Sequence, residues 1–576
     1  MLQNLLYVLL VSGIAVVWGL PVLFFQQKQT TGLWQINRET ILFSFFAGLI
    51  LIGLASSWLS LFMGLNYIVL IISTTLLFFL ELLWFRKARQ RKKLLVNSVR
   101  IIFNAITIFF FCAILLFIFL GSSKPVMEDT DLYHIQIIRW NQQYGTVPGV
   151  ANLYLRYGFF SNWFHLISLF SFPFKHQNFL FLNITLAIWL VFFLLHKLQF
   201  HFLNQNNKAN RTLGVFYFLI LTCMFIEWDL LRGTASSTSY DFIVTSLLLM
   251  ALLLVIEVFL LNNTTPPTSL IAIFCIAAPF FKITGAPALI ILFVYFLLSK
   301  QSLKKYFFAF AVFLLFFIPY LVKNYIQTGY FLFPYSSFPN TIKPDWQVPK
   351  ELLTRFTDFI NLGNKYINHS TASGGWEHLH QLFFAWIPIW IRHLTLFDKI
   401  ISVLVAAGIL LSFFVPVFKH RKLRIIYYSC ALIIPFWFFT APDHRFAYGL
   451  TIFLAFLPLS YLSESIVKKK IINASLLLTA LIMVIYIFPK TKNFYPENLV
   501  HPPPILIPPY QKINIANYSL HLPEKINGNW NSRCYDTPLP CLYQLNPYLE
   551  ARGKELKDGF RMKPITDSSF ILNFRY

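Results

Sequence analysis

Long apolar runs separated by short polar stretches dominate the chain. Residues 101–120, IIFNAITIFFFCAILLFIFL, are a typical run, and about 20 such residues cross a bilayer as an α-helix. Two further apolar, aromatic stretches, 159–173 and 378–392, would break the alternation of membrane sides if they crossed, so we interpret them as interfacial or re-entrant helices. The pattern predicts an all-α polytopic membrane protein with about fourteen transmembrane helices, at residues 2–25, 40–62, 66–85, 101–120, 178–198, 212–227, 240–261, 268–281, 284–299, 306–323, 397–417, 424–440, 446–466 and 471–488.

The positions of the basic residues predict the orientation of these helices. A net charge of +24 is compatible with nucleic-acid binding. The lysines and arginines, however, gather in short runs between apolar segments, at 86–93, 300–305, 419–424 and 468–470. Such runs are typical of cytoplasmic loops, so we expect a lipid bilayer and no nucleic acid as partner. The orientation places both termini on the extracytoplasmic side of a bacterial inner membrane.

This orientation also defines the expected domains. Residues 1–488 form a transmembrane domain whose two largest extracytoplasmic loops are 121–177 and 324–396. Residues 489–576 begin with a proline-rich stretch and then mix polar and apolar positions, which predicts a small extracytoplasmic C-terminal segment with a few strands and a modest core.

Two of the six cysteines lie in this C-terminal segment. Cys534 and Cys541 bracket the sequence CYDTPLPC, whose two prolines favour a tight loop. In an oxidising compartment this spacing predicts a disulfide. A metal site is the weaker alternative, because no second Cys or His pair lies at ligand spacing.

The stretch MEDTDLYHIQIIRWNQQYGTVPG, residues 127–149, concentrates acidic residues at the exit of an apolar run. Glu128, Asp129 and Asp131 fall within four positions of a chain in which only 12% of residues are charged. A helix beginning at Asp129 places Tyr133 on the same face. One acid is explained by capping of that helix. Three acids favour a functional site, since ionisable groups at a membrane surface are costly and often functional.

Several motifs resemble those of GT-C membrane glycosyltransferases, in particular the aminoarabinose transferase and protein mannosyltransferase branch. FKITGAP at 281–287 is similar to the Lys-Gly turn of that branch, and TAPDHRFAYG at 440–449 is similar to its late Arg-aromatic motif. The closest resemblance is to uncharacterised bacterial polytopic membrane proteins with a DTDLYH-like loop and a Cys-containing tail. Two departures are Thr130, where the branch has a second acid, and the absence of paired prolines after Arg156. The resemblance covers about residues 100–490 as an order of elements, and its first loop rests on Asp129, Tyr133, Gly145, Pro148, Arg156 and Trp163.

The resemblance implies a GT-C-like helical bundle that transfers a sugar from a polyprenyl-phosphate-linked donor to an envelope glycan, lipid or protein. The chemistry of the residues is compatible with this reaction, because a lipid phosphate needs permanent cations and an acceptor hydroxyl or amine needs a base. Arg156, Lys282 and Arg445 are the expected phosphate-binding residues. Asp129 is the expected base, and Asp131 or Glu128 would orient the acceptor or assist Mg²⁺ or Mn²⁺. These acids do not form a complete metal-ligand set, so no cofactor is assigned.

Four further residues are candidates for substrate binding, namely Tyr133, His134, Asp241 and Asp443. Three of them have a structural alternative: Asp241 would cap the following helix, Asp443 would pair locally with Arg445, and His134 would only form hydrogen bonds. Lys282 would likewise extend toward lipid headgroups.

Three other functions remain open from the sequence. An O-antigen polymerase or ligase uses the same lipid-phosphate chemistry, but it relies on arginines and His. A lipid-linked glycan transporter or flippase would place charges at the centre of the membrane and show internal repeats. A non-catalytic assembly protein is the third alternative.

Overall fold

Helices form most of the structure. The computed structural model places 71% of the chain in helices, with almost no sheet. Nine helices of the described part are long and apolar enough to cross a membrane: α1 (Leu2–Thr30), α2 (Arg38–Leu59), α3 (Tyr67–Gln90), α7 (Phe181–Leu203), α8 (Lys208–Ile226), α9 (Asp241–Leu260), α12 (Leu303–Thr328), α17 (Arg421–Thr440) and α19 (Lys469–Thr491). The residues outside the description are 31–33, 91–93, 97–103, 124, 177–178, 204–206, 228, 262–266, 337–341, 367–383, 492–496, 498–499, 516–517, 525–532, 568–569 and 572–576.

Five shorter apolar helices occupy the remaining predicted ranges. They are α4 (Ala105–Gly121), α10 (Thr268–Phe281), α11 (Pro287–Leu298), α16 (Leu396–Ser412) and α18 (Tyr448–Ser463). They contain 12 to 17 residues. At a rise of about 1.5 Å per residue they are shorter than a bilayer core of about 30 Å. Every predicted range therefore contains a helix, and nine of these helices meet the length expected of a span.

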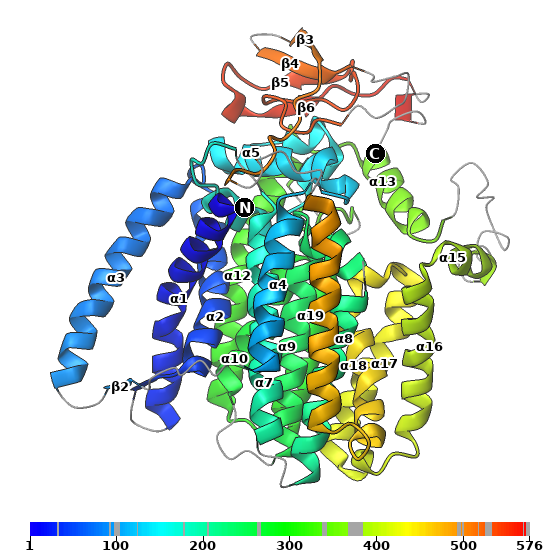
Figure 1. Cartoon of the computed structure of the whole chain (residues 1–576). Coiled ribbons are helices and arrows are strands. Elements are labelled where there is room, and N and C mark those ends of the chain that lie inside the picture. The colour runs from blue at the N-terminus through cyan, green and yellow to red at the C-terminus, as the bar shows by residue number, and fades with distance from the viewer. Residues whose placement is uncertain are drawn as a thin grey trace.

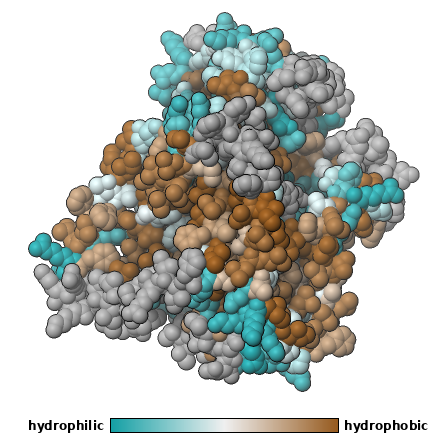
Figure 2. Space-filling view, in the orientation of Figure 1, coloured by the Kyte–Doolittle hydropathy of each residue, from teal (hydrophilic) through white to brown (hydrophobic). Residues whose placement is uncertain are grey.

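The helices stand side by side in one bundle, and the C-terminal segment covers one end of it (Figure 1). We call this end the tail-side end. Figure 2 shows a hydrophobic band across the middle of the bundle, with hydrophilic residues toward both ends. The central helix α9 is buried over 94% of its apolar length, whereas the outer helix α3 is buried over only 11%. Apolar side chains that face outward on this scale are typical of a surface solvated by lipid.

The loop between α4 and α7 contains a π-helical turn (Thr130–His134), α5 (Ile135–Gln143), a 3-10 turn (Leu155–Gly158) and α6 (Asn162–Leu169). The stretch 159–173, predicted as an interfacial or re-entrant helix, contains α6, whose eight residues are all buried and which packs against α2 and α5. Protein rather than lipid surrounds α6, so the interfacial alternative needs correction and the re-entrant alternative stays a prediction. In the other aromatic stretch, 378–383 lies outside the described residues, and α15 (Ile387–His393) is too short to span.

The described residues of the C-terminal segment include two small antiparallel pairs of strands. β3 (Tyr510–Ile515) pairs with β4 (Tyr518–Pro523), and β5 (Leu549–Ala551) pairs with β6 (Phe560–Met562). The predicted disulfide joins Cys534 to Cys541. Two three-residue strands near the opposite end of the bundle, β1 (Trp34–Ile36) and β2 (Leu94–Val96), form a parallel pair.

Candidate functional site

A cavity of about 590 Å³ opens at the tail-side end of the bundle. Segments far apart in the chain meet there: the acidic loop, the 3-10 turn after it, the start of α9, the turn between α10 and α11, and the motif between α17 and α18. Seven of the predicted site residues line this cavity: Asp129, Tyr133, His134, Arg156, Asp241, Lys282 and Arg445. Their proximity results from packing, since more than 300 residues of sequence separate the first from the last.

Asp129 lies between two guanidinium groups. Its carboxylate oxygens are 3.3 Å from Nη1 of Arg156 and 3.6 Å from Nη1 of Arg445. Asp129 precedes the π-helical turn but makes no capping hydrogen bond to it, so capping does not explain its position. Burial favours the protonated acid, but the two guanidinium groups outweigh burial and hold the pKa of Asp129 below its ordinary value of 3.8. The carboxylate is therefore ionised at neutral pH.

Lys282 forms the second charged pair of the cavity. It follows α10 in an extended conformation, and its Nζ lies 2.5 Å from Oδ1 of Asp241. The ammonium also lies 3.8 Å from the ring centre of Phe446 and 4.6 Å from that of Tyr240. Asp241 is the first residue of α9, and its other carboxylate oxygen accepts a hydrogen bond from the Ser239 hydroxyl. Lys282 therefore points into protein rather than toward lipid headgroups.

Arg445 also takes part in the local pair that the sequence offered as an alternative. Its Nε lies 2.8 Å from Oδ2 of Asp443, whose other oxygen accepts a hydrogen bond from the Arg445 backbone N–H. Asp443 does not line the cavity. Arg445 thus connects an acid outside the cavity with Asp129 inside it, so the local ion pair and the place in the site coexist.

Tyr133 and His134 form the aromatic wall beside Asp129. The Arg156 guanidinium lies 5.3 Å from the ring centre of Tyr133, a cation–π arrangement. His134 Nδ1 hydrogen-bonds the hydroxyl of Thr238 at 2.8 Å, and its Nε2 has no hydrogen-bond partner among the described residues. Burial lowers the pKa of His134 to about 3, so the imidazole is neutral at physiological pH. A neutral ring suits hydrogen bonding to a ligand better than charge pairing.

Glu128 and Asp131 do not line the cavity. The Glu128 side chain is 76% exposed and lies 2.8 Å from Arg533 of the C-terminal segment. The backbone carbonyl of Asp131 accepts a hydrogen bond from the backbone N–H of Tyr535. Neighbouring positions of a helical turn point in different directions, so only one of the three acids enters the cavity.

The donor set does not fit a divalent cation. In the part of the chain that the structure describes, no three His, Cys, Asp or Glu side chains are grouped to hold a metal ion. Each carboxylate of the cavity is already neutralised, Asp129 by arginines and Asp241 by Lys282. Mg²⁺ and Mn²⁺ require several oxygen ligands at once. These residues therefore do not supply the ligand set of a Mg²⁺ or Mn²⁺ site.

Sequence reasoning missed one wall of the cavity. Trp437 and Phe436 of α17 and Asn361 and Asn364 at the end of α13 (Lys350–Gly363) line it. The amphipathic pattern of α13, KELLTRFTDFINLG, was a usable signal because it marks a helix with one buried face. The TASGG stretch at 371–375, within the predicted loop 324–396, lies outside the described residues.

The fold and the cavity define a multi-pass membrane protein with a charged, aromatic cavity at one end of its helical bundle. The family described as "Domain of unknown function (DUF8201)" matches residues 1–452, and the chain belongs to it. No curated protein and no solved structure matches the chain.

Proposed function

We propose that the protein is a membrane glycosyltransferase that moves a sugar from a polyprenyl-phosphate-linked donor to an envelope glycan, lipid or protein. The observation that carries this proposal is that Asp129 and the cations Arg156, Lys282 and Arg445 line one cavity. A sugar-phosphate transferase needs both kinds of group within one substrate length.

The proposed topology has fourteen spans in a bacterial inner membrane, with both termini and the cavity on the extracytoplasmic side. The disulfide between Cys534 and Cys541 supports this orientation, because disulfides persist in oxidising compartments. The basic run 419–424 supports it as well, since it lies at the start of α17, whereas the other end of α17 lines the cavity.

In the proposed reaction the lipid phosphate is the leaving group. The acceptor oxygen or nitrogen attacks the anomeric carbon, the bond from that carbon to the phosphate oxygen breaks, and the acceptor proton passes to Asp129. Arg445 and Lys282 stabilise the negative charge on the departing phosphate. The phenyl and indole rings of Phe436 and Trp437 on α17 provide an apolar wall for the first isoprenoid units.

Binding of the donor would also change the basicity of Asp129. In the free protein Arg156 and Arg445 stabilise its charged form, which makes it a weak base. A phosphate that recruits these guanidinium groups leaves a partly buried carboxylate with fewer cations, and its pKa rises toward that of an effective base. The donor thus prepares the base for the acceptor.

Donor binding can be tested separately from catalysis. We expect Arg156→Gln to weaken the binding of farnesyl phosphate, a short polyprenyl phosphate, by about tenfold or more, because one charge-assisted contact is worth about 1.5–3 kcal/mol. Binding is measured on purified protein in nanodiscs. Arg211→Gln is the control, since Arg211 pairs with Glu464, away from the cavity residues. Equal affinity of both variants and the unchanged protein would contradict the placement of the phosphate.

The proposed orientation can be tested by labelling single cysteines from the two sides of the membrane. Val126, three positions before Asp129 in the chain, is 58% exposed, and Lys419 is exposed at the start of the basic run. A membrane-impermeant maleimide added to intact cells is expected to label Val126→Cys and not Lys419→Cys. Permeabilised cells should show both labels. Labelling of position 419 alone in intact cells would invert the topology and refute the extracytoplasmic site.

A further inference from the structure

The disulfide loop of the C-terminal segment, residues 533–542, docks on the segment that carries Asp129. Arg139 of α5 forms two 2.7 Å contacts with the carboxylate of Asp536, through Nε and Nη2. Gln136 donates hydrogen bonds from Nε2 to the backbone carbonyls of Tyr535 at 3.0 Å and Thr537 at 2.9 Å. Both side chains lie within ten residues of Asp129 along the chain.

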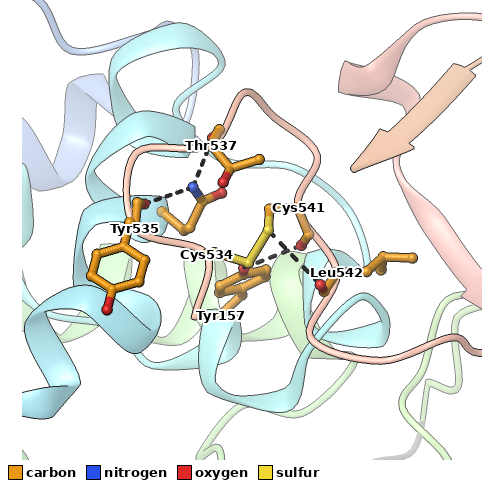
Figure 3. Close-up of a disulfide and its surroundings, with 7 residues drawn as sticks. Tyr157, Cys534, Tyr535, Thr537, Cys541 and Leu542 are labelled. Carbon is orange, nitrogen blue, oxygen red and sulfur yellow. Dashed lines mark hydrogen bonds between the residues drawn. A yellow bond between two sulfur atoms is a disulfide. The ribbon is translucent and has the colours of Figure 1, made fainter. Parts of the chain in front are cut away.

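Further contacts continue this interface on both sides. The backbone N–H of Tyr535 donates to the carbonyl of Asp131 at 2.9 Å, and Arg533 pairs with Glu128 at 2.8 Å. The hydroxyl of Tyr157, next to Arg156, donates to the carbonyl of Cys541 at 3.2 Å (Figure 3). The two ends of the disulfide loop therefore contact the neighbours of both members of the Asp129–Arg156 pair.

The disulfide keeps these contacts in one rigid unit. Both cysteines are fully buried, and the bond closes a loop that contains the three residues contacting Gln136 and Arg139. Without the bond, the loop gains conformational entropy that each of its contacts must then overcome. On the side away from the disulfide loop, the segment with the π-helical turn Thr130–His134 presents Asp129 and Tyr133 to the cavity.

We propose that the disulfide loop positions Asp129 in the cavity, with Gln136, Arg139 and Asp536 as positioning residues. The loop itself does not line the cavity. It holds the π-helical turn and α5 from the side away from the substrate, so its effect on the site passes through the backbone of residues 129–143. The family match ends at residue 452, so this positioning element lies beyond the matched region.

The inference rests on the proposed function only for its effect on ligand binding. A second docking point of the same tail gives a matched control: Arg552 contacts Asp345 at 2.9 Å, on the loop between α12 and α13 rather than on the acidic loop. If the tail were only a cover, loss of either contact would have the same effect on residues 129–143.

The experiment compares hydrogen exchange and farnesyl phosphate binding in nanodiscs. We expect Asp536→Asn and the pair Cys534→Ser with Cys541→Ser to speed amide exchange in residues 129–143 by about tenfold or more, and Arg552→Gln to leave it unchanged. Farnesyl phosphate affinity should fall in the first two variants only. A charge-reversed pair, Arg139→Asp with Asp536→Arg, should recover slow exchange relative to either single change.

Each outcome decides one of the two claims. Unchanged exchange in residues 129–143 after loss of the disulfide and of Asp536 would overturn the positioning role. The same exchange increase in Arg552→Gln would overturn it as well. Faster exchange in the first two variants, with no farnesyl phosphate binding by the unchanged protein, would support the positioning role and count against the proposed function.

Discussion

Asp129→Asn is expected to slow sugar transfer by about two to four orders of magnitude, the usual contribution of a general base. Asparagine retains the size of the side chain but accepts no proton, and it leaves Arg156 and Arg445 without their shared carboxylate. The measurement is the initial rate of transfer from a set of polyprenyl-phosphate sugars by the purified protein. Asp131→Asn is the matched control, because Asp131 lies two positions away and does not line the cavity. We expect it to change the rate less than tenfold.

The pH profile adds a second criterion to this prediction. The acceptor proton can pass only to ionised Asp129, so the rate should fall as the pH drops through the pKa of Asp129 in the donor-bound state. In the free protein the pKa of Asp129 lies below its ordinary value of 3.8. The stability that the arginine pairs contribute to the folded protein is therefore present at neutral pH, and it is lost only as the pH falls through this lowered pKa. Full activity of Asp129→Asn, or an unchanged acid limb in a partly active variant, would exclude Asp129 as the base.

Arg445→Ala is expected to reduce kcat by about two to three orders of magnitude, comparable with the loss of one oxyanion-stabilising donor. Arg445 contacts both Asp129 and Asp443, so its removal also leaves two carboxylates with one cation fewer. Arg445→Lys should restore part of the rate, because lysine supplies the charge without the bidentate geometry. Steady-state kinetics on the same donors separate kcat from KM.

The control for Arg445→Ala is a change on α17, the helix that precedes Arg445 in the chain. Arg424 is exposed near the start of α17, away from the cavity, and Arg424→Ala should leave both constants unchanged. A rise in KM with an unchanged kcat in Arg445→Ala would mean that Arg445 binds the ground state and the transition state equally. That result would remove Arg445 from the stabilisation of the leaving group.

The helices were predictable because the signal for each is local. The apolar run 240–261 predicts a helix without reference to any distant residue, and α9 lies within one residue of it at each end. The start of α11 was less predictable. The sequence predicts spans at 268–281 and 284–299, and α10 occupies the first of these ranges as predicted, whereas α11 begins only at Pro287, after a short 3-10 turn, and contains 12 residues.

The candidate site was predictable as a set of residue types but not as a set of contacts. The resemblance points to Asp129, Lys282 and Arg445 separately, and each lies next to a recognisable motif. Nothing in the sequence indicates that Arg156 and Arg445 share one carboxylate, or that Glu128 faces the tail. Those outcomes depend on the rotation of the turn at 130–134 and on the docking of residues 533–542.

The sequence by itself determined the membrane class, the places of the apolar helices and the two cysteines that pair, because hydrophobic runs and short-range spacing encode them; the structure gives nine helices of spanning length among the described residues, where the sequence predicted about fourteen. Only the tertiary structure decided which acid of MEDTDLYH enters the cavity and which cations surround it. The physical reason is that a contact between Asp129 and Arg445 requires the helices that precede and follow each of them to pack in one arrangement. That arrangement is a property of the whole bundle, and no local pattern contains it.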